Sequence, residues 1–94
     1  MPDEQNQVQK SFTIKNTLGL HARAAAAFVK IANRFQSEIT VRKDDAEVNG
    51  KSIMGVLMLA AAQGSRIDIT VRGGDASEAM DAIGRLIEDK FGEN

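Results

Sequence analysis

Hydrophobic side chains recur along this 94-residue chain with two alternating periods, and this alternation limits the folds that the chain can adopt. Residues 66–72 show a period of two, because Ile67, Ile69 and Val71 alternate with polar or charged residues, as in a strand with one buried face. Residues 22–35 show instead the period of a helix with one apolar face. Successive segments of these two kinds give the order β-α-β-β-α-β-α.

This order of elements predicts one sheet with helices on a single face. The predicted strands are residues 8–16, 38–42, 46–49 and 66–72, and the predicted helices are residues 22–35, 52–64 and 75–91. Asp75 and Glu78 have the spacing of a capping box at the start of the last helix. Amphipathic helices on one face of a sheet bury all the apolar faces. We therefore predict an α+β fold, an open-faced sandwich with a four-stranded antiparallel sheet covered on one face by three helices.

Length and composition exclude several classes of protein. We predict a disordered tail at residues 1–7 and a single domain at residues 8–94. We expect the protein to be a monomer. The formal charge of −1 does not suit broad nucleic-acid binding. The absence of cysteine excludes disulfides and thiolate metal sites and fits a cytoplasmic protein. No apolar segment is long enough to span a membrane, and the polar start of the chain does not resemble a secretory signal.

The only histidine, His21, lies at the predicted junction between the first strand and the first helix. Free backbone N–H groups and the positive end of the helix dipole meet there, so the backbone of Ala22 and Arg23 can bind an anion. The guanidinium of Arg23 adds donors that match phosphate oxygens. A lone histidine is commonly a surface or capping residue, but a cation in the first helical turn is electrostatically unfavourable and favours a functional explanation. We interpret His21 and Arg23 as a phosphoryl-binding pair that needs no metal or other cofactor.

Two motifs resemble those of HPr, the histidine-containing phosphocarrier family of the bacterial phosphotransferase system. Residues 18–23, LGLHAR, resemble the active-site signature of the family, and residues 50–56, GKSIMGV, resemble its second signature around a regulatory serine. The order of the predicted elements agrees over residues 8–91. The family usually has proline where Ala24 stands, and because both residues fit the first helical turn, we expect altered rigidity or partner preference rather than altered chemistry.

The resemblance implies a role for each matching residue. His21 would accept a phosphoryl group from phosphorylated enzyme I, which phosphoenolpyruvate charges, and pass it to an EIIA-type permease component or a regulator. Arg23 would position that group. Ser52, which by residue type favours a helix N-cap, would be phosphorylated by an HPr kinase/phosphorylase and so slow the transfer at His21. A transcriptional regulator is a further partner that the resemblance implies.

The predicted second helix carries more apolar residues than one buried face can hold. Its expected inner face consists of Ile53, Val56, Leu57 and Ala60. We expect Met54 and Leu57, with Leu20, to form an exposed apolar patch near His21 that several partners contact. The alternative is that the apolar stripe of the helix, Ile53, Met54, Leu57 and Met58, belongs to the core, as such a stripe usually does.

Two other functions remain open at this point. A regulatory HPr paralogue, of a nitrogen branch or acting through phosphorylated Ser52, shares these motifs, although His21 favours a carrier. A ferredoxin-like module that binds a small molecule fits the order of elements but leaves His21 and Arg23 unexplained. An RNA-recognition module needs exposed aromatic residues, whereas this chain has no tyrosine or tryptophan.

Overall fold

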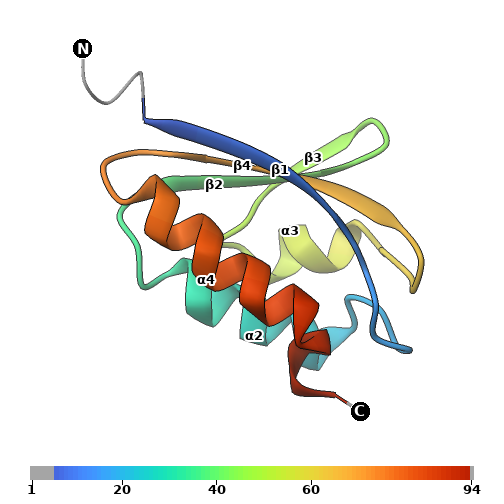
Figure 1. The fold of residues 1–94 in the computed structure, drawn as a ribbon. Helices are drawn as coiled ribbons and strands as arrows, with labels where there is room; N and C mark the ends of the chain where they lie inside the picture. The colour runs from blue at the N-terminus through green and yellow to red at the C-terminus, as the bar shows by residue number, and fades with distance from the viewer. Residues whose placement is uncertain (1–5, 94) are drawn as a thin grey trace.

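Antiparallel strands with helices on one face make up the computed structural model, which describes residues 6–93 (Figure 1). The elements are β1 (Gln7–Thr13), α2 (Ala22–Ala32), β2 (Glu38–Lys43), β3 (Ala46–Asn49), α3 (Ile53–Met58), β4 (Arg66–Arg72), α4 (Ala76–Glu88) and the short 3-10 helix η1 (Lys90–Gly92). The strands lie in the order β1-β4-β2-β3, and each neighbouring pair is antiparallel. The predicted α+β open-faced sandwich is confirmed.

The hydrophobic core lies between the sheet and the helices. Alternate residues of β4 face it, and Ile67, Ile69 and Val71 are fully buried while the residues between them are not. Phe28 of α2 and Ile83 of α4 belong to the same core and are also fully buried. Burial of each such side chain contributes roughly 1.5–3 kcal/mol, so the apolar stripes determine which face of each element turns inward.

The first strand lies closer to the start of the chain than the sequence pattern predicts. It begins at Gln7, within the segment predicted as a tail, where it pairs with Arg72. It ends at Thr13 rather than at residue 16. Residues 1–5 of the predicted tail lie outside the described residues.

The helices also end earlier than the pattern predicts. Their observed last residues are Ala32, Met58 and Glu88, where the pattern predicts ends near Phe35, Gly64 and Phe91. Positive backbone φ angles account for the last two ends, with 49° at Ala60 and 58° and 57° at Lys90 and Phe91. An α-helix contains only negative φ angles, and residues of these types give no sequence signal for such a turn.

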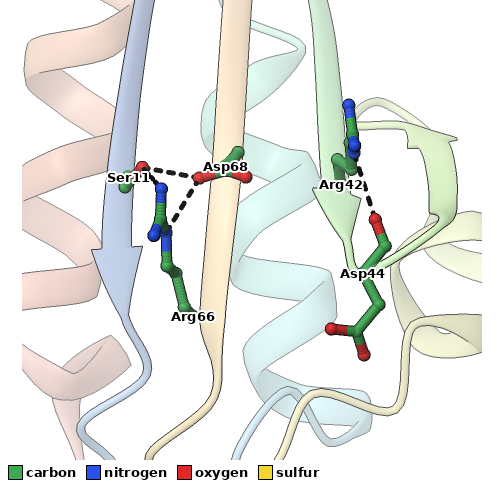
Figure 2. Close-up of polar contacts among 5 residues, drawn as sticks. All are labelled: Ser11, Arg42, Asp44, Arg66 and Asp68. Carbon is green, nitrogen blue, oxygen red and sulfur yellow. Dashed lines mark hydrogen bonds and ion pairs between the residues drawn. The ribbon is translucent and has the colours of Figure 1, made fainter.

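The face of the sheet opposite the helices carries a polar cluster (Figure 2). Ser11 of β1 and Asp68 of β4 are register partners, and the Ser11 hydroxyl donates a hydrogen bond of 2.5 Å to the Asp68 carboxylate. Arg66 donates to both, at 3.0 Å to Ser11 Oγ and 3.3 Å to Asp68 Oδ1. The Ser11 hydrogen bond and then the Arg66 charge lower the pKa of Asp68. These polar partners let the outer face of the sheet remain in contact with solvent.

Asp75 links the start of α4 to the loop between α2 and β2. Its side chain makes no capping hydrogen bond to α4, so the predicted capping box is wrong. Its carboxylate instead accepts hydrogen bonds from Gln36 N at 2.9 Å and Ser37 N at 3.0 Å, and from the Ser37 hydroxyl. The hydroxyl of Ser37 contributes most to a lowered pKa of Asp75. Because Ser37 is buried, its two bonds to Asp75 satisfy donors that water does not reach.

We expect Asp75→Ala to lower the free energy of unfolding at pH 7 by about 1–3 kcal/mol, because it leaves buried donors at Ser37 without an acceptor. Urea unfolding measures this change, with Asp81→Ala, an exposed position of α4, as the control. The lowered pKa means that folding favours the ionised carboxylate. The contribution of Asp75 is therefore present above its ordinary pKa of 3.8 and is lost as the pH falls through the lower pKa of the folded state. Equal stability of the two variants at pH 7 would contradict this role.

Candidate functional site

His21 is the N-cap residue of α2. Its backbone is extended, with φ −74° and ψ −179°, and its carbonyl oxygen accepts the hydrogen bond of Ala25 N at 2.8 Å. Its side chain makes no capping hydrogen bond, and the first turn of α2 contains no acidic residue. The N–H groups of the exposed residues Ala22 and Arg23 therefore remain available to an external acceptor at the positive end of the helix dipole.

Backbone hydrogen bonds hold the loop before His21 against the segment between α3 and β4. Ile14 N donates to Ser65 O at 2.8 Å, and Gly64 N donates to Ile14 O at 2.8 Å. Further along the loop, Leu20 N donates to Ala61 O, also at 2.8 Å. These bonds fix the path of the chain immediately before His21.

Gly19 is the glycine of the loop whose conformation the site requires. Its φ is +66°, which side chains rarely adopt, and an added Cβ would collide with the Ala61 carbonyl oxygen and lie 2.9 Å from Ala62 Cα. The close approach of these backbones allows the Leu20–Ala61 hydrogen bond to form next to His21.

A carboxylate that the sequence analysis missed contacts His21. Glu93 follows η1, which lies beside α2, and its Oε2 forms a hydrogen bond with His21 Nε2. The side chains of His21 and Glu93 are 27% and 15% exposed, so the contact is partly shielded from solvent. The hydrogen bond with His21 contributes most to a lowered pKa of Glu93, and the charge of Arg23 adds to it. No local signal identifies Glu93, because 72 residues separate it from His21.

Asn16 is a second residue of the site that the sequence analysis missed. It is almost completely buried, and its Nδ2 donates to Gly19 O at 2.7 Å and to Glu93 Oε1 at 3.2 Å. Asn16 thus joins the loop before His21 to the carboxylate that contacts His21. The only sequence signal for Asn16 is that it is a polar residue at the end of a predicted strand.

The predicted phosphoryl-binding residues lie together at the start of α2. Ala22 and Arg23 are both exposed in the first turn, next to His21. Within residues 6–93, Arg23 takes part in no ion pair, so its guanidinium is open to a ligand.

Ser52 is the N-cap of α3, where its Oγ accepts a hydrogen bond from Gly55 N at 3.0 Å.

The predicted apolar patch differs in composition from the observed one. Leu20 is only 4% exposed and belongs to the core, so its inclusion was wrong, and Leu57 is half-buried against the core. Met54 is 70% exposed, as expected. Ile53 and Ala60, expected on the inner face of the second helix, are both exposed. We call the exposed large side chains of this helix, Ile53, Met54 and Met58, the α3 patch.

Leu18 extends the exposed apolar surface toward His21. It is 66% exposed in the loop before His21, and this loop is hydrogen-bonded to the segment that follows α3. Since α3 also packs against α2, the helix that carries the α3 patch adjoins the helix that His21 precedes. Exposed apolar groups beside a polar site are typical of a surface that contacts other proteins.

The candidate site lies partly open to solvent, with 27% of the His21 side chain exposed. A groove of about 570 Å³, lined in part by Glu38, Lys51 and Arg72, does not include His21. Within residues 6–93, no group of three or more His, Cys, Asp and Glu side chains is placed to hold a metal ion. No helix in the described part of the chain is long and apolar enough to span a bilayer.

We expect Gly19→Ala to lower the free energy of unfolding by about 2 kcal/mol more than Gly64→Ala, because it adds a backbone collision to the cost of a positive φ. Gly64 is a matched control, since its φ is +89° and nothing lies within 4 Å of an added Cβ. Urea unfolding of the two variants measures the difference. Equal losses of stability would mean that the approach of Ala61 to Gly19 is not a constraint on the loop.

Comparison with known proteins gives consistent matches over most of the chain. The family model described as "PTS HPr component phosphorylation site" matches residues 8–89. A phosphocarrier protein HPr of Neisseria meningitidis is 51% identical over 86 residues, which cover 92% of this chain and 97% of the relative. An HPr-like protein Crh of Halalkalibacterium halodurans is 49% identical and covers 86% of this chain and 96% of its own. The crystal structure of HPr-C-His from Thermoanaerobacter tengcongensis matches with a TM-score of 0.90 at 47% identity, covering 93% of this chain and 98% of that structure.

Proposed function

The chain belongs to the HPr family of phosphocarrier proteins of the phosphotransferase system, and we propose that His21 is the residue that carries the phosphoryl group. The observation that supports this role is the position of the only histidine at the N-cap of α2, beside exposed backbone donors and the exposed Arg23. A phosphoryl group bound to His21 would bring its negative charge to the positive end of the helix.

The residues of the first turn have distinct tasks in this proposal. A ring nitrogen of His21 forms a bond to phosphorus while the bond between phosphorus and the donor breaks, and the donor keeps the electron pair of the broken bond. The Arg23 guanidinium and the N–H groups of Ala22 and Arg23 bind the phosphoryl oxygens. Ala24 stands where the family usually has proline and retains an N–H group that proline would lack. Ala24 is fully buried in the core, so we expect it to alter the rigidity of this turn rather than to contact the phosphoryl group.

We propose phosphorylated enzyme I as the donor and an EIIA-type component or a regulator as the acceptor. We also propose that this chain is a monomer when it meets each of them. The α3 patch supports protein partners of this kind, because exposed methionines adapt to different surfaces. Met54 would be central to the contact, and half-buried Leu57 of the same helix would add to it. A cytoplasmic location fits these partners and the absence of cysteine.

His21→Ala is expected to abolish labelling when the chain is incubated with phosphoenolpyruvate and enzyme I. The label is measured as acid-labile, base-stable phosphate. Arg23→Ala is expected to slow labelling about 100-fold, because it removes charged donors to the transferred group. Arg34→Ala, which removes an exposed arginine just beyond α2, is the matched control. Full labelling of His21→Ala would place the acceptor elsewhere, and an Arg23→Ala rate equal to that of Arg34→Ala would remove the positioning role.

We also propose that phosphorylation of Ser52 by an HPr kinase/phosphorylase regulates transfer. The Ser52 hydroxyl lies at the N-terminus of α3, directly before Ile53 and Met54 of the α3 patch. A phosphate there would add between about 1.5 and 2 negative charges at the edge of an apolar docking surface. The modified residue could still accept a hydrogen bond from the helix, so the fold would be retained.

Ser52→Asp is expected to weaken binding of enzyme I, about tenfold, because it puts a charge beside the α3 patch while aspartate remains a good N-cap. Titration calorimetry measures the dissociation constant. Ser77→Asp adds the same charge at an exposed position near the start of α4 and serves as the control. If both variants bind as tightly as the unaltered chain, Ser52 is only a helix cap.

The similarity to an HPr-like protein Crh gives one alternative a specific basis. In that alternative the chain is a regulatory paralogue that acts through Ser52 and a transcriptional regulator, and His21 is not used. A folded chain that takes no label from enzyme I but accepts phosphate from ATP and HPr kinase would favour it. The family match over residues 8–89 argues against a ferredoxin-like module that binds a small molecule.

A further inference from the structure

We propose that Lys10 blocks pairing of the free edge of β1 with β1 of a second copy of this chain, so that a chain without this lysine forms an edge-to-edge dimer. Lys10 belongs neither to the residues assigned to phosphoryl binding nor to the α3 patch. Its role is therefore independent of the function proposed for His21.

The described part of the chain has two outer strands, β1 and β3, and they differ in length (Figure 1). An outer strand presents N–H and C=O groups on its free side that can pair with another chain. β3 has 4 residues and offers a short edge, whereas β1 has 7 residues, all of them paired with β4 on the other side. Within residues 6–93, no loop or helix backbone is hydrogen-bonded to the free side of β1. The longer edge is thus the one that needs protection.

Lys10 lies on the face of the sheet that the helices cover. Its register partner in β4 is Ile69, which is fully buried in the core, and side chains directly opposite each other share a face. Val8 and Phe12, two residues before and after Lys10, pack against the core as the strand period requires. Lys10 therefore occupies a position where the alternation predicts an apolar residue, and it is exposed only because β1 is at the edge. An inward-pointing charge at such a position is a known safeguard of outer strands.

A groove of about 500 Å³ between β1 and α4 connects Lys10 with solvent. Asp81, Arg85 and Glu88 of α4 also line this groove, but within residues 6–93 Lys10 forms no ion pair with them or with any other residue. A lysine in this setting lays its stem along apolar surface and keeps its ammonium group in water. A second chain on the edge of β1 would cover the groove and remove that water.

The symmetry of a dimer makes Lys10 the centre of the most extensive pairing. Two copies of β1 that pair antiparallel are related by a two-fold axis, so full overlap puts Gln7 opposite Thr13 and Lys10 opposite Lys10 of the second copy. The Cβ atoms of such residues are about 4.5–5.5 Å apart, where like charges are destabilising. A shift of the register by two residues puts Lys10 opposite Val8 or Phe12 instead, where the ammonium group would lose water without gaining a partner. Lys10 thus opposes each of these registers.

The first test is the state of association of Lys10 variants of the full chain, measured by sedimentation equilibrium at the millimolar concentrations of an NMR sample. We expect Lys10→Val to dimerise where the unaltered chain and Lys10→Arg are monomers, with a dissociation constant at least about tenfold lower. Valine suits a position opposite Ile69, so the fold is retained, and circular dichroism checks this. Lys10→Gln removes the charge without adding an apolar group, and its dimer is expected to be intermediate in strength.

Gln9→Val is the matched control, because it adds the same side chain to the outer face of the same strand. We expect this variant to stay monomeric. Folded Lys10→Val and Lys10→Gln chains that remain monomers would overturn the proposal, and so would a Gln9→Val dimer as strong as that of Lys10→Val. An unaltered chain that already pairs through β1 would overturn it as well.

A mixture of two chains tests the register. When the unaltered chain is mixed with Lys10→Glu, a carboxylate of one copy lies opposite the Lys10 ammonium group of the other, and opposite charges at such positions attract. We expect the mixture to associate more strongly than either chain alone. Association no stronger in the mixture would overturn the pairing of Lys10 with itself.

Backbone hydrogen exchange identifies the surface that associates. We expect amides of residues 7–13 that point away from β4 to exchange more slowly in Lys10→Val as its concentration rises, while the amides of β3 exchange as before. Slower exchange in α3 without any change in β1 would overturn the proposal, because the α3 patch would then be the surface that associates. None of these measurements uses phosphate or enzyme I, so their outcome and that of the labelling of His21 are independent.

Discussion

The site depends on the backbone hydrogen bonds that join the loop before His21 to the segment between α3 and β4. The bonds at Ile14 and Leu20 continue the contact of β1 with β4 beyond the end of the regular strand pairing. They fix the direction from which the chain enters α2, and they bring the end of α3 to the same loop. The histidine and the apolar surface beside it are therefore placed by one set of main-chain contacts, which do not depend on side-chain identity except at Gly19.

A positive side chain at the start of α2 is electrostatically unfavourable, and a carboxylate from a distant part of the sequence compensates for it. Arg23 lies at the positive end of α2, and no acidic residue of the first turn offsets it. Glu93 brings a negative charge to this region from beyond η1, and Asn16 supports it from within the loop. Loop, helix start and final described segment thus meet at His21, although they are far apart in the chain (Figure 1). The positive end of α2 and the exposed guanidinium of Arg23 are what a site for a transient anion needs.

Sequence alone predicted the features that depend on local periodicity or on one residue type at a helix start. The strand 66–72, the start of α2 at Ala22 and the Ser52 cap agree with the structure. It did not predict the contacts of Glu93 and Asp75, because their partners are distant in the chain and a carboxylate can pair with many donors. Leu20 was misplaced because one apolar residue in a loop has no period that indicates whether it faces the core.

Alanine at position 24 also has a consequence for the time course of folding. The only proline in the sequence is Pro2, so no bond that precedes a proline lies within residues 6–93. The chain also contains no cysteine. Isomerisation of prolyl bonds and rearrangement of disulfides are the common causes of slow refolding phases, which last tens of seconds or more. The described domain is free of both, and its refolding rate is set by the assembly of a sheet whose neighbouring strands β1 and β4 are far apart in the sequence.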